Sequence, residues 1–342
     1  MPSSWDPESR QHVTPPRRDL IDDIAIGYQA SQILLTANRL GLFAALADRS
    51  KDHLQLADDL ETDPRGTRIL CDALVDLGVL ERTAEGYKPG SDARRHLLPN
   101  CAEPRADLLA HGSRLYERWA GLYDAVKTGS PVTDHQLDPR LEGSEREFAR
   151  AMADVGRRSA AATCELLDLS GASHVLDLGG GPGIYAIEFA RAWPDLEVTV
   201  FDTPAALGVA RKNLETSGVA DRVHLRAGDA FEDSLGGPYD AIFISNVIHI
   251  YSADDNRRLV ARCANCLKVG GLLILKDFFL DDDRQRPAGG AVFAVNMLVS
   301  TEGGDCYTVT ETRSWLEAAG LALEETLDVA SKSRLLVASK RP

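Results

Sequence analysis

The fold of this chain is decided by the stretch Val175-Leu-Asp-Leu-Gly-Gly-Gly-Pro-Gly-Ile184. Its first, apolar residues predict a short buried strand, and its glycines predict a tight turn that leads into a helix. Glycine permits that bend and lets a ligand approach main chain that a Cβ would shield. A second strand ends at Asp202, about 20 residues past the turn, where an acidic side chain can hold two ribose hydroxyls. The segment therefore predicts a βαβ unit that binds a nucleoside.

The glycines fit two nucleoside-binding patterns. The dinucleotide pattern Gly-x-Gly-x-x-Gly/Ala fits only in the frame of Gly181, Gly183 and Ala186, which starts late in the turn and places Pro182 between the glycines. The pattern Asp-x-Gly-x-Gly-x-Gly over residues 177–183 covers more of the segment.

In this second frame the chain resembles the S-adenosylmethionine-dependent methyltransferases. Within them it is similar to the plant-type and bacterial natural-product O-methyltransferases that carry an N-terminal winged-helix dimerisation domain. The resemblance extends from about Asp19 to Ala338 and is most specific at 177–183, 228–231 and 245–252. It implies a small-molecule methyl acceptor, a homodimer and S-adenosyl-L-methionine as the methyl donor.

Composition and charge exclude several other classes of protein. The chain of 342 residues has 44% hydrophobic residues, enough for more than one core, and a net charge of −14 that repels nucleic acid and anionic lipid surfaces. Its start lacks the pattern of a signal peptide and no apolar run approaches the ~20 residues that span a bilayer, so we expect a cytoplasmic protein. The only closely spaced cysteines, Cys263 and Cys266, lie late in an expected helix and favour packing over a metal or redox site.

The first part of the chain predicts a winged helix. Residues 1–18 are proline-rich and indicate a flexible tail, whereas residues 19–100 predict helices followed by a small hairpin. Asp63 suits the N-cap of one helix and Gly78 its end, and the hairpin spans 79–88. A DNA-binding winged helix should carry a basic recognition helix, but this helix is rich in aspartate. The resemblance instead assigns the module to dimerisation.

The rest of the chain predicts connecting helices and then an α/β domain. Residues 101–170 are expected to form a helical linker and substrate-pocket helices, and residues 171–342 a Rossmann-like, seven-stranded sheet. Strands and helices alternate there, which is typical of a parallel sheet covered on both faces. The last two strands are joined by too few residues for a parallel crossover, so we expect an antiparallel hairpin. The expected strands are 174–178, 197–202, 222–227, 239–245, 271–279, 321–330 and 333–339.

Acidic residues at strand ends outline the cofactor site, because open α/β sheets bind ligands beyond the carboxyl ends of their strands. The resemblance assigns the glycine turn to the methionine moiety, Asp202 to the ribose and Asp229 to the adenine amine. An acidic rim also suits a sulfonium cation. The full set of expected cofactor-binding residues is Asp177, Gly179, Gly181, Gly183, Asp202, Asp229, Ala230, Phe231 and Ser245.

A histidine after the fourth strand is the expected general base. Ser252 suits the N-cap of a helix, which places His249 at a strand-to-helix junction on the cofactor's edge. A phenol with a pKa near 10 is only about one part in a thousand ionised at neutral pH, so a histidine base would speed its methylation. The resemblance assigns this role to His249, in a pattern like Leu-His-Asp-Trp, and assigns Asp277 to hold the far ring nitrogen.

The chain departs from the plant-type pattern in the same region. Ile250 and Tyr251 replace the acid and tryptophan that follow the histidine, and Cys306 falls near the place of a second catalytic glutamate, with Glu302 as a possible substitute. Acceptors that are easily deprotonated would tolerate a less assisted base. The expected substrate-pocket residues are Trp119, Phe148, Met152, Asn296 and Met297, with Tyr116 and Phe293 as further candidates.

The sequence thus predicts O-methylation of a small aromatic or polyketide-type natural product. C-methylation of a keto acid or enol on the same scaffold is the nearest alternative, but a metal-assisted version would need a second histidine near His249. A ligand-sensing winged-helix regulator and a dehydrogenase are the alternatives of other classes.

Overall fold

The computed structural model describes residues 19–131, 144–329 and 333–341, so the expected tail at 1–18 lies outside the described residues. The chain divides after Gly90 into two compact units. The sequence placed the end of the first domain at residue 100. The helix at Ser91–His96 belongs to the second unit because Arg95 and His96 accept backbone hydrogen bonds from Glu103 and Arg105, which follow it.

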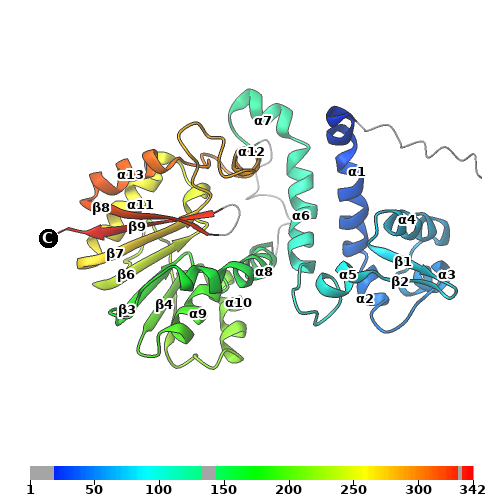
Figure 1. Cartoon of the computed structure of the whole chain (residues 1–342), viewed down its shortest axis with the longest axis horizontal. Helices are drawn as coiled ribbons and strands as arrows, with labels where there is room; N and C mark the ends of the chain where they lie inside the picture. The colour runs from blue at the N-terminus through cyan, green and yellow to red at the C-terminus, as the bar shows by residue number, and fades with distance from the viewer. Residues whose placement is uncertain (1–18, 132–143, 330–332, 342) are drawn as a thin grey trace, which may run out of the picture. The chain divides into compact units, whose positions relative to one another are not determined.

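The first unit is a small helical domain with a two-stranded hairpin (Figure 1). Asp63 caps the fourth helix, as the sequence indicated, and Asp52 caps the third helix in a capping box with Gln55, which was not predicted. Its elements are α1 (Leu20–Arg39), α2 (Leu42–Ala45), α3 (His53–Asp59), α4 (Pro64–Asp76), β1 (Leu80–Thr83) and β2 (Gly86–Pro89).

The predicted hairpin pairs β1 with β2 in antiparallel register. Gly86 has φ +128°, and a Cβ there would lie 2.2 Å from the Lys51 carbonyl oxygen, so only glycine fits. The hydroxyl of Tyr87 donates to Asp72 of α4 at 2.7 Å. Asp72 also pairs with Arg68 and Arg82, so it links the helix to the hairpin.

The second unit contains one seven-stranded sheet in the order β5-β4-β3-β6-β7-β9-β8 (Figure 1). The first five strands of that order are parallel, and the β8–β9 hairpin adds two antiparallel strands. The bounds are β3 (His174–Leu178), β4 (Glu197–Asp202), β5 (Val223–Ala227), β6 (Tyr239–Ser245), β7 (Leu267–Asp277), β8 (Leu321–Val329) and β9 (Ser333–Lys340). This confirms the predicted architecture.

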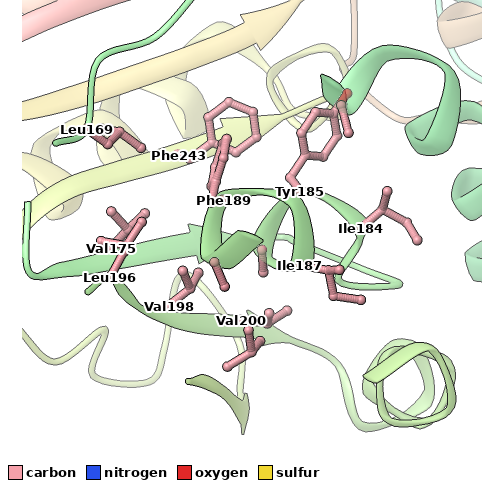
Figure 2. Packing of buried hydrophobic residues seen from close by; sticks show 14 of the residues in the cluster. Leu169, Val175, Ile184, Tyr185, Ile187, Phe189, Leu196, Val198, Val200 and Phe243 are labelled. Atoms are coloured by element: carbon pink, nitrogen blue, oxygen red, sulfur yellow. The ribbon is translucent and has the colours of Figure 1, made fainter. Parts of the chain in front are cut away.

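Helices cover both faces of the sheet, with one apolar cluster on each face. One cluster contains residues of α8, α9 and α10, and Figure 2 shows Tyr185 and Phe189 of α9 packed against Phe243 of β6. The other contains residues of α11 and α13. The helices of this unit are α5 (Ser91–His96), α6 (Ala106–Trp119), α7 (Leu122–Thr128), α8 (Ser144–Glu165), α9 (Ile184–Ala192), α10 (Pro204–Glu215), α11 (Ala253–Asn265), α12 (Gly290–Ser300) and α13 (Val309–Ala318), with a 3₁₀ turn η2 at Ile248–Ile250.

The fifth strand was predicted to begin at residue 271, and it begins at Leu267 instead. The register of its pairing with β6 shifts between Tyr239 and Ala241, so the irregular start was not visible as alternation in the sequence. Cys263 and Cys266 lie at the end of α11 and are not disulfide-bonded. Across the described ranges, no helix is long and apolar enough to cross a membrane.

Candidate active site

A cavity of about 360 Å³ opens at the carboxyl ends of β3, β4 and β6. Ligands of open α/β sheets bind at this edge. Seven residues expected from the sequence line it: Asp177, Gly179, Gly181, Asp202, Ser245, Phe148 and Met152. The other lining residues are Ala149, Val155, Gly156, Gly180, Pro182, Ile184, Tyr185, Thr203, Ala206, Asn246, Val247, Ile250 and Tyr251.

The glycine turn after β3 leaves no room for side chains where it meets its neighbours. Gly179 has φ +69°, and a Cβ there would lie 2.6 Å from Cγ2 of Val247. A Cβ on Gly180 would lie 2.5 Å from Oδ2 of Asp177. The turn therefore presents bare main chain to the cavity, as a cradle for a ligand requires.

Asp202, at the end of β4, is fixed by two main-chain donors. Its Oδ2 accepts from the Gly181 amide at 2.7 Å, and its Oδ1 accepts from the Thr203 amide at 2.6 Å. A pre-oriented carboxylate at this point suits the two adjacent hydroxyls of a ribose.

Asp177 is a buried acid at the base of the cavity, only 1% exposed. Within the described residues neither of its carboxyl oxygens is hydrogen-bonded. Burial raises the pKa of Asp177 to about 7, and the negative charge of Asp202 adds to the rise, while the Ala186 amide acts weakly in the opposite direction. A buried acid without a partner fits a cationic ligand group, which would satisfy it.

His249 and Asp277 meet at the carboxyl ends of β6 and β7. His249 is the middle residue of η2 and is 8% exposed, and Asp277 ends β7 and is 2% exposed. Nδ1 of His249 lies 2.6 Å from Oδ1 of Asp277, and the His249 main-chain amide donates to Oδ2 at 3.2 Å. A carboxylate only accepts hydrogen bonds, so in the neutral imidazole the proton lies on Nδ1 and the lone pair on Nε2.

The walls around the imidazole are aromatic and come from α12 and the segment after β7. The ring of Phe293 stands edge-on to His249 with centroids 4.9 Å apart, and Phe278 lies 5.9 Å from the same ring. Phe293, one of the further candidates named from the sequence, belongs to α12, so this helix reaches the histidine.

Asn256 of α11 holds the turn that carries His249. It is fully buried, and its Nδ2 donates to the carbonyl oxygens of Ile248 at 2.8 Å and Tyr251 at 3.1 Å. The Tyr307 hydroxyl also donates to the Tyr251 carbonyl, at 2.6 Å. The two ends of the turn are thereby fixed from behind. Sequence reasoning missed Asn256, because helix periodicity marks it only as a core position.

The remaining expected pocket residues lie outside the cavity lining. Trp119 of α6 donates from Nε1 to Oδ1 of Asn296 on α12 at 3.0 Å, so these two connect the helices. Met297 is 6% exposed and packs into the interior. Phe148, in contrast, does line the cavity, and its ring packs edge-on against that of His111 with centroids 5.2 Å apart.

Several expected cofactor-binding residues also do not line the cavity. Gly183 is the N-cap of α9. Asp229 is exposed, and its Oδ1 accepts from the amides of Phe231 and Glu232. Phe231 contacts the lining residue Tyr251, with ring centroids 4.8 Å apart.

The two residues considered for a second catalytic acid differ in their surroundings. Glu302 is exposed. Cys306 is buried, and burial with the negative charge of Asp277 raises the pKa of its thiol to about 12. Burial therefore favours the protonated thiol over the thiolate.

Comparisons with known proteins agree on one family. Residues 117–322 match an O-methyltransferase domain, and residues 23–98 match an O-methyltransferase dimerisation domain. The chain is 32% identical to 3-hydroxy-5-methyl-1-naphthoate 3-O-methyltransferase of Streptomyces sahachiroi, over 91% of this chain and 92% of that protein. It is 30% identical to the tetracenomycin polyketide synthesis 8-O-methyl transferase TcmO of Streptomyces glaucescens, over 93% and 95%.

Solved structures give the same result. Human N-acetylserotonin methyltransferase in complex with S-adenosylmethionine superposes with a TM-score of 0.85 at 27% identity, over 100% of both chains. PigF with S-adenosylhomocysteine superposes with a TM-score of 0.85 at 25% identity, over 94% of this chain and 98% of PigF.

The cavity fits S-adenosylmethionine on its own features. The bare glycine turn leaves space for the methionine moiety, the unpartnered Asp177 suits its cationic groups, and Asp202 suits its ribose. The chain belongs to the S-adenosylmethionine-dependent O-methyltransferases and carries the dimerisation domain of that family.

Proposed function

We propose that this enzyme methylates a hydroxyl group on a small aromatic or polyketide-type natural product, with His249 as the general base. S-adenosylmethionine supplies the electrophilic methyl group. The observation that carries the proposal is the 2.6 Å contact between Nδ1 of His249 and Oδ1 of Asp277. Among the described residues Nε2 of His249 makes no hydrogen bond, so its lone pair is available to an acceptor hydroxyl.

Asp277 supports the base in two ways. It fixes the tautomer that leaves Nε2 unprotonated, and its negative charge stabilises the imidazolium that forms when the proton is taken. General bases of this kind contribute about 10²- to 10⁴-fold in rate. Because Ile250 stands where plant-type relatives have an acid, we infer acceptors whose hydroxyl is acidified by a neighbouring carbonyl or an extended aromatic system.

The acceptor is proposed to lie against the aromatic wall formed by Phe293 and Phe278. The Trp119–Asn296 hydrogen bond sets the position of α12, which carries Phe293, relative to α6. Fused aromatic acceptors are also consistent with the two Streptomyces relatives, which are named for a naphthoate and for tetracenomycin. The adenine-side assignment of Asp229, Ala230 and Phe231 belongs to the same proposal.

The working form is proposed to be a homodimer assembled through the first unit. This unit matches a dimerisation domain, and the N-terminal half of α1 exposes large apolar side chains at Leu20, Ile21, Ile24 and Tyr28. Exposed apolar surface of this extent is typical of a protein interface. Native mass spectrometry should give twice the 37.1 kDa chain mass, and a monomer at micromolar concentration would contradict this part of the proposal.

The activity is tested by incubation with methyl-labelled donor and a panel of phenols, hydroxynaphthoates and hydroxylated polyketide aromatics. NMR of the product then locates the methyl group. A methyl on oxygen supports the proposal, whereas a methyl on carbon, or no transfer to any member of the panel, counts against it.

A further inference from the structure

A buried lysine lies near the cavity and takes no part in the proposed proton transfer. Lys276 precedes Asp277 on β7 and is 3% exposed. Successive side chains of a strand point to opposite faces, so Lys276 lies on the face opposite to that of Asp277 and His249. That is the face of Ile274, in the cluster packed against α8 and α9.

The two neighbours of Lys276 on this face both line the cavity. Lys276 is directly paired with Ser245 in the parallel register of β6 and β7, and paired residues project to the same face. Its Nζ lies 5.7 Å from the ring centre of Tyr185, whose hydroxyl is held 2.7 Å from the Ser159 hydroxyl. Ser245 and Tyr185 are both lining residues.

The ammonium group has no anionic partner. Throughout the described parts of the chain, no carboxylate lies within 4.0 Å of Nζ and no hydrogen bond from Nζ is formed. Lysine is almost never fully buried unless its charge is paired. The face of the Tyr185 ring offers only weak compensation at this distance.

We propose that Lys276 is an anion-recognition residue that receives a carboxylate presented in the cavity. Its flexible four-carbon stem lets the ammonium reach past Ser245 and Tyr185 to a bound ligand. The cavity would then be electrostatically divided, with Asp177 and Asp202 on the β3–β4 side for cationic and hydroxyl groups and Lys276 on the β7 side for the anion.

Two carboxylates can meet this ammonium. One is the α-carboxylate of the methionine moiety of the cofactor, and the other is a carboxylate on the acceptor. If the carboxylate comes from the cofactor (the cofactor source), the proposal depends only on cofactor binding in the cavity. If it comes from the acceptor (the acceptor source), the proposal also rests on the proposed function. Both possibilities are tested by binding measurements without catalysis. A negative result for Lys276 is therefore distinguishable from a result showing that His249 is not the base.

The test is calorimetric titration of the full chain and of Lys276→Met, with Lys268→Met as the matched control. Lys268 lies on the same strand but is exposed and paired with Asp240. The ligands are S-adenosylhomocysteine and 5′-methylthioadenosine, which lacks the amino-acid part. The cofactor source predicts at least tenfold weaker binding of S-adenosylhomocysteine by Lys276→Met, with 5′-methylthioadenosine and Lys268→Met unchanged.

The acceptor source is tested in the presence of saturating S-adenosylhomocysteine, with a hydroxynaphthoate and its uncharged methyl ester as probes. It predicts at least tenfold weaker binding of the acid by Lys276→Met and unchanged binding of the ester. Lys276→Gln, which keeps a polar head without the charge, should behave like Lys276→Met. If Lys276→Met and Lys276→Gln fold and bind S-adenosylhomocysteine, 5′-methylthioadenosine, the hydroxynaphthoate and its ester as the parent does, Lys276 does not bind an anion.

Discussion

Asp277 holds His249 at two points, the ring Nδ1 at 2.6 Å and the main-chain amide at 3.2 Å. One carboxylate therefore orients both the imidazole and the turn that carries it. This double attachment fixes the orientation of a side chain that lies on a short 3₁₀ turn, η2.

The first prediction concerns Asp277→Asn. The amide keeps the shape of the side chain but can donate to Nδ1, which moves the ring proton to Nε2 and removes the base. We expect kcat to fall about 10²- to 10⁴-fold. Binding of S-adenosylhomocysteine should stay unchanged in calorimetry. Asp282→Asn, at an exposed acid on the segment after β7, is the control and should keep full activity. If the Asp277→Asn variant kept the parental kcat, the Asp277 carboxylate would not contribute to catalysis.

The second prediction concerns Asn256, whose side-chain amide binds the carbonyl oxygens of Ile248 and Tyr251. Asn256→Leu removes the donor shared by the carbonyls of Ile248 and Tyr251 and leaves them buried without it. We expect a loss of about 1–3 kcal/mol in the free energy of unfolding. Displacement of His249 should also lower kcat by at least tenfold while the KM for S-adenosylmethionine is unchanged. A purely structural role would lower stability and leave kcat per folded molecule intact, which urea titration and active-site counting together would show.

The third prediction concerns pH and Asp177. The pKa of this carboxyl is raised to about 7 in the folded, ligand-free protein, above its ordinary value. Between that ordinary value and about 7, the folded state binds more protons than the unfolded state, so Asp177 lowers stability progressively as pH rises through this window. Asp177→Asn, which cannot ionise, should therefore raise Tm relative to the parent, and the difference should grow from pH 5 to pH 8. A constant Tm difference across this range would contradict the assignment.

The fourth prediction compares two glycines. Gly179→Ala places a Cβ 2.6 Å from Cγ2 of Val247 at a positive φ, so the turn must distort and cofactor binding should weaken at least tenfold. Gly208 lies inside α10, and a Cβ there meets nothing within 4 Å. Gly208→Ala should therefore leave binding intact and add about 0.5–1 kcal/mol of stability. Equal binding by the two variants would show that the turn does not contact the cofactor.

The sequence predicted the sheet well because its signals are local. The strands 174–178, 197–202 and 239–245 were predicted to the residue, since each is a short apolar run ended by an acid, a glycine turn or a polar loop. The irregular start of β7 was missed because a shift in strand register leaves no periodic mark.

The site residues could be predicted only where they belong to a recognisable sequence motif. Asp177, Asp202 and the glycines come from one motif, and they meet in one cavity. Lys276 and Asn256 were not predicted, because their importance depends on burial and on contacts that form only in the folded chain. A lysine on a strand is ordinarily at the surface, and only the pairing of β7 with β6 places this one beside the cavity.

In the proposed mechanism His249 takes the proton from the acceptor hydroxyl. The most direct test of this step is the single-turnover rate of His249→Ala with labelled S-adenosylmethionine and an acceptor identified from the phenol panel. We predict at least a hundredfold slower transfer by this variant, with S-adenosylhomocysteine bound as tightly as by the parent. A rate equal to that of the parent would contradict this mechanism.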